Sequence, residues 1–101
     1  MGRGNKAAPA FLVEHYWPAG TPSTFVTATA RLRAAVELLT SAGTAVQLLH
    51  ATFVPEEGSA FCVFSCSSPE LVEEAYKRAG IAFERMLDAV EIEPERDKEP
   101  R

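Results

Sequence analysis

Apolar residues recur along the central part of the chain with the spacing of helices in two places and of strands in four. From Phe25 to Leu39 they return every three or four residues, which places them on one face of a helix. Thr21 followed by Pro22 is a typical helix start, and Gly43 suits the left-handed residue that ends one. We therefore predict a first helix that begins at Pro22 and ends just before Gly43.

A second, shorter helix is predicted after the serine pair 67–68 and Pro69. Glu70 lies three residues after Ser67, which is the spacing of a capping box. Gly80 is expected to end this helix. Its buried positions share the helical spacing; they are Val72, Ala75, Tyr76 and Ala79.

Strand-like segments cover residues 10–17, 44–54, 60–66 and 86–92, where branched and aromatic side chains gather. The second and third are joined by the polar turn 55–59 and form a hairpin. The predicted order is therefore β-α-β-β-α-β, the split βαβ arrangement of α+β ferredoxin-like folds. Right-handed crossovers place both helices on one face of a four-stranded antiparallel sheet.

The other face of this sheet is predicted to be apolar as well. In the third strand Phe61 and Val63 point to one side, and Cys62 and Phe64 point to the other. In the second strand, Leu49, Ala51 and Phe53 oppose Val46, Leu48 and Val54. Because two helices cover only one face, we expect the second face to be covered by another copy of the chain, as a homodimer.

Composition and charge indicate a one-domain protein and argue against nucleic-acid-binding and membrane-spanning classes. The chain has 101 residues, of which 47% are hydrophobic and 24% charged, with a formal net charge of -4. This is enough for one domain, predicted at 10–92, between a flexible N-terminal tail (1–9) and a charged C-terminal tail (93–101). The acidic balance argues against a nucleic-acid partner, and no apolar run approaches the roughly 20 residues of a membrane span. Without an apolar leader segment, the expected location is the cytoplasm.

Cys62 and Cys66 are the two cysteines of the chain. On a strand they lie ~13 Å apart, too far for a disulfide within that strand, so we expect two reduced thiols and a reducing compartment. Cys62 is a soft metal ligand in principle, but a small buried hydrophobic residue is the more ordinary role. With Tyr16, Trp17 and Phe64 it forms a set that either lines a pocket or packs in the core.

Three residues are candidate metal ligands: Glu14, His15 and His50. Glu14 is the one carboxylate of the first strand; it is either a metal ligand or general base, or half of an ion pair across a dimer interface with Arg31 or Arg33. Neutral imidazole suits nickel or zinc, although a histidine near a strand end is often only exposed or hydrogen-bonded. Glu14 and His15 are neighbours and face opposite sides of a strand, so the predicted site lies at or near the dimer interface.

Four segments resemble a family of small bacterial proteins, some of which are described as nickel-binding. They are residues 11–18 (FLVEHYWP), 49–57 (LHATFVPEE), 61–64 (FCVF) and 79–85 (AGIAFER), in that order. The resemblance implies a dimeric ferredoxin-like fold that binds nickel or another divalent transition metal. His15 departs from the family pattern, which has a basic residue, usually arginine, at this position.

Proteins with this order of elements also include enzymes and RNA-binding modules. Dimeric ferredoxin-like proteins include cofactor-independent monooxygenases and cyclases, so an enzyme acting on a small organic molecule is the alternative function. The sequence has no GxSxG, phosphate-binding loop or HExxH motif, and no catalytic residue is assigned. RNA recognition through this topology needs aromatic residues two apart on the third strand, whereas Phe61 and Phe64 are three apart.

Overall fold

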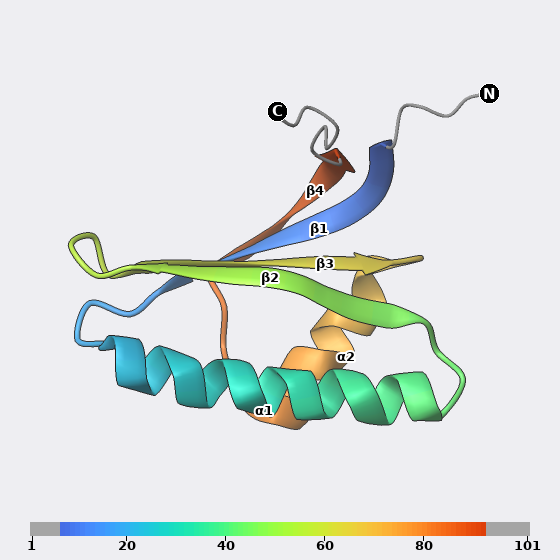
Figure 1. The fold of residues 1–101 in the computed structure, drawn as a ribbon, viewed down its shortest axis with the longest axis horizontal. Coiled ribbons are helices and arrows are strands. Elements are labelled where there is room, and N and C mark those ends of the chain that lie inside the picture. The colour runs from blue at the N-terminus through green and yellow to red at the C-terminus, as the bar shows by residue number, and fades with distance from the viewer. Residues whose placement is uncertain (1–6, 93–101) are drawn as a thin grey trace, which may run out of the picture.

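The computed structural model describes residues 7–92, which form the predicted β-α-β-β-α-β series (Figure 1). Each element begins or ends within a few residues of its predicted position. The elements are β1 (Ala7–Tyr16), α1 (Pro22–Ser41), β2 (Val46–Val54), β3 (Ser59–Cys66), α2 (Pro69–Ala79) and β4 (Arg85–Ile92). β1 takes in residues 7–9, which the sequence assigned to the N-terminal tail. The C-terminal tail prediction, 93–101, lies outside the described residues.

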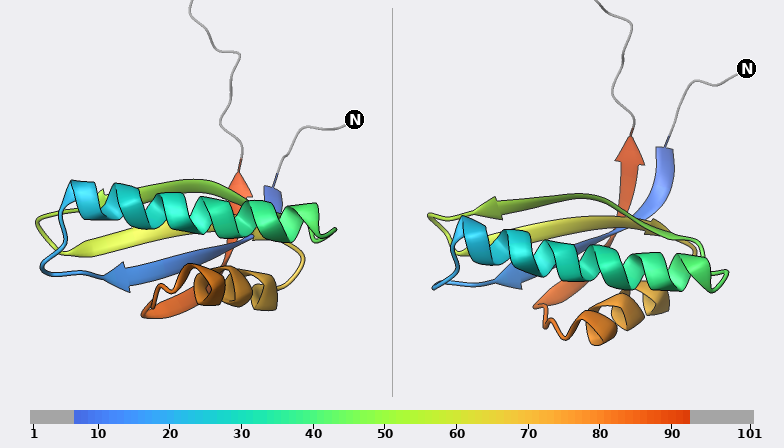
Figure 2. Two further views of the ribbon diagram at one scale, coloured as in Figure 1. Left: turned by 90° about the horizontal axis from the view of Figure 1, so that it is seen from below. Right: turned by 60° about the horizontal axis from the view of Figure 1, so that its bottom comes forward.

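The four strands form one sheet in the order β2-β3-β1-β4, and every neighbouring pair is antiparallel. Both helices lie on the same side of this sheet (Figure 2). The predicted α+β ferredoxin-like fold is therefore confirmed. Within residues 7–92, neither helix has the length and apolar character that crossing a membrane would require.

Local signals at the helix ends act largely as predicted. Thr21 caps α1: its hydroxyl accepts a hydrogen bond from the Thr24 N–H at 3.2 Å, and the Thr21 N–H donates to the Thr24 hydroxyl at 2.9 Å. Gly43, just beyond the end of α1, has a φ of 101°, which favours glycine. Gly80 ends α2 in the left-handed conformation.

The predicted capping box at the start of α2 is wrong. Ser68, rather than Ser67, is the N-cap residue, and its side chain makes no capping hydrogen bond. This places Glu70 one position too early in the helix to reach back to the N-cap. Pro69 fixes the first turn instead.

A bulge in β2 changes which side chains face the helices. Leu48 pairs with Phe64 and His50 with Val63, so Leu49 is an extra residue between them. Val46 and Leu48 therefore lie on the same side as Ala51 and Phe53, against the prediction that they oppose one another. The other side of β2 carries Gln47, His50, Thr52 and Val54.

The core lies between the sheet and the helices. Val13, Cys62, Phe64, Val72 and Ala75 have no exposed surface there. At ~25 cal/mol per Å² of buried apolar surface, the burial of each larger side chain in this set stabilises the folded state by about 1.5–3 kcal/mol. The helices thus cover the central part of one side of the sheet, and no element within residues 7–92 covers the other side.

Candidate functional site

The side of the sheet that faces away from the helices is called the open face below. Its middle row runs across all four strands, from His50 through Val63 and Leu12 to Leu87. The start of β1 and the end of β4 rise away from the helices, so the sheet curls toward this side (Figure 1). Leu87 is 36% exposed, and Leu12 is half-buried. The open face is therefore a curved surface with an apolar centre.

Glu14 lies on the open face beside this apolar row. Its carboxylate accepts hydrogen bonds from Arg85 of β4, from Nε at 2.9 Å and from Nη2 at 3.3 Å. The carboxylate in turn raises the pKa of Arg85. Within the chain, Glu14 forms its ion pair with Arg85 of β4. The pairing with Arg31 or Arg33 across a dimer interface stays a prediction.

His50 and Glu91 form a second polar pair on the open face. The His50 Nε2 and Glu91 Oε2 atoms are 3.7 Å apart, although their strands, β2 and β4, are the two edges of the sheet. The side chains are 55% and 39% exposed. The curl of the sheet brings these edges together and leaves a nitrogen and an oxygen donor accessible side by side.

His15 lies on the opposite side of β1, among the helices, and is only 3% exposed. Its Nδ1 is 3.2 Å from the Ala60 carbonyl oxygen, and its Nε2 is 2.8 Å from the Tyr76 hydroxyl. Since a carbonyl only accepts, Nδ1 carries the proton, and the bare Nε2 accepts from Tyr76. Both ring nitrogens are occupied, so the imidazole has no atom free for a metal.

The three predicted metal ligands therefore do not converge. Glu14 and His50 share the open face, and His15 is buried on the other side, as its position next to Glu14 implied. In residues 7–92, no group of three or more His, Cys, Asp or Glu side chains is placed to hold a metal ion. Among the described residues, any of these positions therefore offers at most a pair of donors to a metal ion.

Tyr76→Phe is expected to lower the free energy of unfolding by about 1–3 kcal/mol, because it leaves the buried His15 Nε2 without a donor. Urea denaturation measures this change. Tyr16→Phe is the matched control, since the Tyr16 side chain is 58% exposed and should change stability by less than about 0.5 kcal/mol. Equal effects of the two substitutions would contradict the role given to the Tyr76 hydroxyl.

Stability is expected to fall as the pH drops below about 6.5, the ordinary histidine pKa. Burial lowers the pKa of His15 against a smaller opposing effect of its hydrogen bond to Ala60. The unfolded chain therefore binds a proton before the folded chain does, with a slope of at most about 1.4 kcal/mol per pH unit. Unfolding of His15→Gln should lose this dependence, whereas His50→Gln should keep it; the reverse pattern would refute the assignment.

The four predicted pocket residues separate into two pairs. Tyr16 and Trp17 line a pocket of about 500 Å³ beside the start of α1 and the segment after α2. Cys62 and Phe64 lie in the core with no exposed surface. Burial raises the pKa of the Cys62 thiol, which keeps it protonated and makes it a poor metal ligand.

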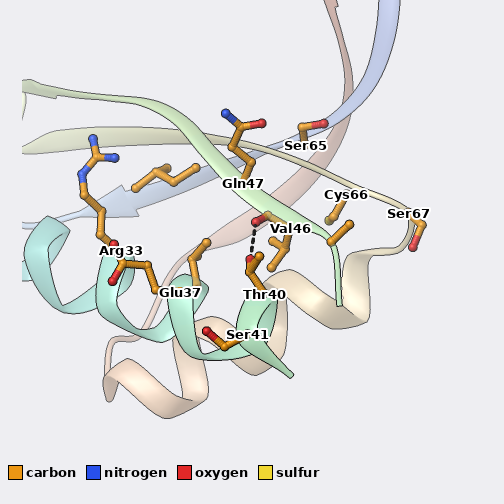
Figure 3. Close-up of a pocket in the computed structure, with 12 residues that line it drawn as sticks. Arg33, Glu37, Thr40, Ser41, Val46, Gln47, Ser65, Cys66 and Ser67 are labelled. Atoms are coloured by element: carbon orange, nitrogen blue, oxygen red, sulfur yellow. Dashed lines mark hydrogen bonds between the residues drawn. The ribbon is translucent and has the colours of Figure 1, made fainter. Parts of the chain in front are cut away.

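A larger groove, of about 950 Å³, runs between the second half of α1 and the adjoining ends of β2 and β3 (Figure 3). Thr40 closes one side of it by donating to the Val46 carbonyl oxygen at 3.1 Å. Its lining includes Arg33, Glu37 and Cys66. The Cys66 thiol donates to the Ser68 carbonyl oxygen, and burial raises its pKa, so the groove offers no activated nucleophile.

The polar roles of two residues, Glu91 and Tyr76, were not predicted from the sequence. Glu91 is the penultimate residue of β4 and lies in an acidic stretch that resembles the neighbouring tail. The curl of the sheet brings it to His50. Tyr76 was predicted as part of the buried stripe of α2, but its hydroxyl partner lies 61 residues away in sequence. A buried tyrosine needs a partner for its hydroxyl, and that was the available signal.

Comparison with known proteins identifies the family of this chain. A profile of the family described as "Nickel responsive protein SCO4226-like" matches residues 11–88. The crystal structure of SCO4226 from Streptomyces coelicolor A3(2) is similar, with a TM-score of 0.62 and 20% identity over 77% of this chain and 91% of that chain. At this identity the likeness supports the fold alone. No curated protein matches the chain. Because the family profile spans most of the sequence, the protein belongs to the SCO4226-like family of nickel-responsive proteins.

Proposed function

We propose that this protein binds a divalent transition metal ion, nickel by preference, on the open face of its sheet, and that it does so as a homodimer. The observation that carries the proposal is the exposed pair His50 and Glu91. An imidazole nitrogen and a carboxylate oxygen are ligands suited to nickel and zinc.

The spacing of the pair supports this role. Two donors on one metal ion lie roughly 2.9–3.4 Å apart when the metal–ligand bonds are about 2.0–2.1 Å. The His50 and Glu91 atoms, 3.7 Å apart, need to approach by only a few tenths of an ångström. Exposure gives both side chains the freedom to do so.

One chain supplies half of a coordination sphere, and a second copy supplies the rest. A two-fold axis would bring two His50 and two Glu91 side chains to one ion, giving two nitrogen and two oxygen donors. On the apolar row of this face, Leu12 and Leu87 keep exposed apolar surface that a second copy would bury. Metal binding and dimerisation are therefore proposed to use one surface.

This proposal revises the ligand set expected from the sequence. His50 stays, Glu91 is added, and His15 is left out because both of its nitrogens are occupied. Glu14 is a reserve ligand, because a metal would have to displace Arg85 from it. The family description supports nickel over other divalent ions. Two free thiols support a reducing compartment, which we take to be the cytoplasm.

Calorimetric titration of untagged protein with nickel chloride tests the proposal. We expect saturable binding with one nickel ion for every two chains, and no comparable heat with magnesium, which prefers oxygen ligands. A polyhistidine tag has to be absent because it binds nickel itself. A flat nickel titration at neutral pH would exclude the proposed function.

A further inference from the structure

A second pocket lies on the helix side of the molecule, away from the open face. It is formed by the loop between β1 and α1, the first half of α1 and the segment that leads from α2 to β4, and it has a volume of about 500 Å³. Figure 2 shows the end of β1 and the segment after α2 at the same end of the molecule. This volume lies within the range of about 300–1,000 Å³ found for small-molecule sites.

Arg31 is the one charged side chain that lines this pocket. Its Nη2 donates to the Ala79 carbonyl oxygen at the end of α2. Gly80 makes room for this contact, since a Cβ there would lie 3.1 Å from the Arg31 Nη2. The guanidinium is thus held in place by the backbone of the opposite wall.

The charge of Arg31 is not neutralised by the described part of the chain. In residues 7–92 it forms no salt bridge, in contrast to Arg78 and Arg85. A guanidinium has five N–H donors, and the contact with Ala79 uses one. Donors therefore remain for an anion, and a carboxylate matches their planar geometry.

The remaining walls are mainly apolar, with Trp17, Ala28 and Ile81 among them. The Trp17 ring is held by edge contact with Phe25, at 5.6 Å between ring centroids, and by the His15 ring at 5.4 Å. A fixed aromatic wall beside one unpaired cation suits a molecule with an apolar body and a single negative charge.

We infer that this pocket binds a small monocarboxylate with a compact hydrophobic body, its carboxylate on Arg31 and its apolar part against Trp17 and Ile81. The inference is independent of the proposed metal site, because none of its residues lies on the middle row of the open face or in the His50–Glu91 pair.

Trp17 is the single tryptophan of the chain and lines this pocket, so a ligand that enters the pocket should change the tryptophan fluorescence. Titration with cyclohexylacetate in metal-free buffer should give a saturable change. Its neutral analogue, cyclohexylacetamide, should bind about tenfold more weakly, which corresponds to about 1.4 kcal/mol for the lost charge-assisted hydrogen bonds. Absence of saturation with the carboxylate at millimolar concentration, or equal affinity for the amide, would overturn the inference.

Three variants localise the binding. Arg31→Gln should remove the preference for the carboxylate, while Arg33→Gln, on the same helix but in the other groove, should keep it. Ala82→Phe should block both ligands by filling the pocket from an exposed position, without touching the contact between Arg31 and Ala79. Equal losses in Arg31→Gln and Arg33→Gln, or undiminished binding in Ala82→Phe, would place the ligand elsewhere.

Discussion

His50→Ala is expected to lower the affinity of the protein for nickel at least about 100-fold. Loss of a residue that only supports a metal ligand lowers metal affinity about 10–100-fold, and loss of the ligand itself should lower it further. In the proposed dimer each substitution removes two nitrogen donors and leaves only carboxylates, which suit harder ions better than nickel. Calorimetry or competition with a coloured chelator measures the change.

Glu14→Gln is the matched control for this result. Glu14 is a carboxylate on the same face, but Arg85 already occupies it through two hydrogen bonds. We expect its substitution to change nickel affinity by less than about threefold, and Glu91→Gln to resemble His50→Ala. A larger loss in Glu14→Gln than in His50→Ala would show that the sequence-based ligand Glu14 is the principal one.

Leu87→Lys is expected to convert the proposed dimer to a monomer. Leu87 is 36% exposed at the end of the apolar row of the open face, and a two-fold contact there would bury both copies of the introduced charge. Light scattering or sedimentation measures the mass in solution, and circular dichroism should show an unchanged fold because the position is solvent-accessible in the single chain.

Val90→Lys provides the comparison on the same strand. Val90 is 62% exposed but lies three residues further along β4, on the other side of the sheet. The Val90→Lys substitution should leave the proposed dimer intact. If Val90→Lys dissociates the protein and Leu87→Lys does not, the copies associate through the helix side, and the proposed shared site on the open face is lost.

Much of the fold follows from local signals. The helical spacing from Phe25 to Leu39, the Thr21 cap and the left-handed glycines Gly43 and Gly80 were all present in the sequence and act as expected. These features depend on residues close together in the chain. The helical spacing of apolar residues and the residue types at the helix ends therefore suffice to predict them.

The errors arise where one residue changes register or distant segments meet. The bulge at Leu49 places Val46 and Leu48 on the same side of β2 as Ala51 and Phe53, and no sequence motif in this apolar segment predicts a bulge. The contact between His50 and Glu91 spans both sheet edges and depends on curl, which accumulates over the whole sheet. Strand alternation alone separates Glu14 from His15 correctly but cannot find their partners.

β1 illustrates how one strand serves two purposes. His15 faces the core and ties the sheet to α2 through Tyr76, while its neighbour Glu14 faces outward and holds Arg85. The inward residue is therefore expected to govern stability and its pH dependence. The open face, on which Glu14 lies, carries the proposed metal site.

The central claim, a nickel site shared between two copies on the open face, is tested most directly by native mass spectrometry of untagged protein with added nickel. The account predicts a dimer that carries one nickel ion, and a His50→Ala protein that carries none under the same conditions. A monomer that retains nickel, or a dimer with His50→Ala that retains it equally well, would contradict the account.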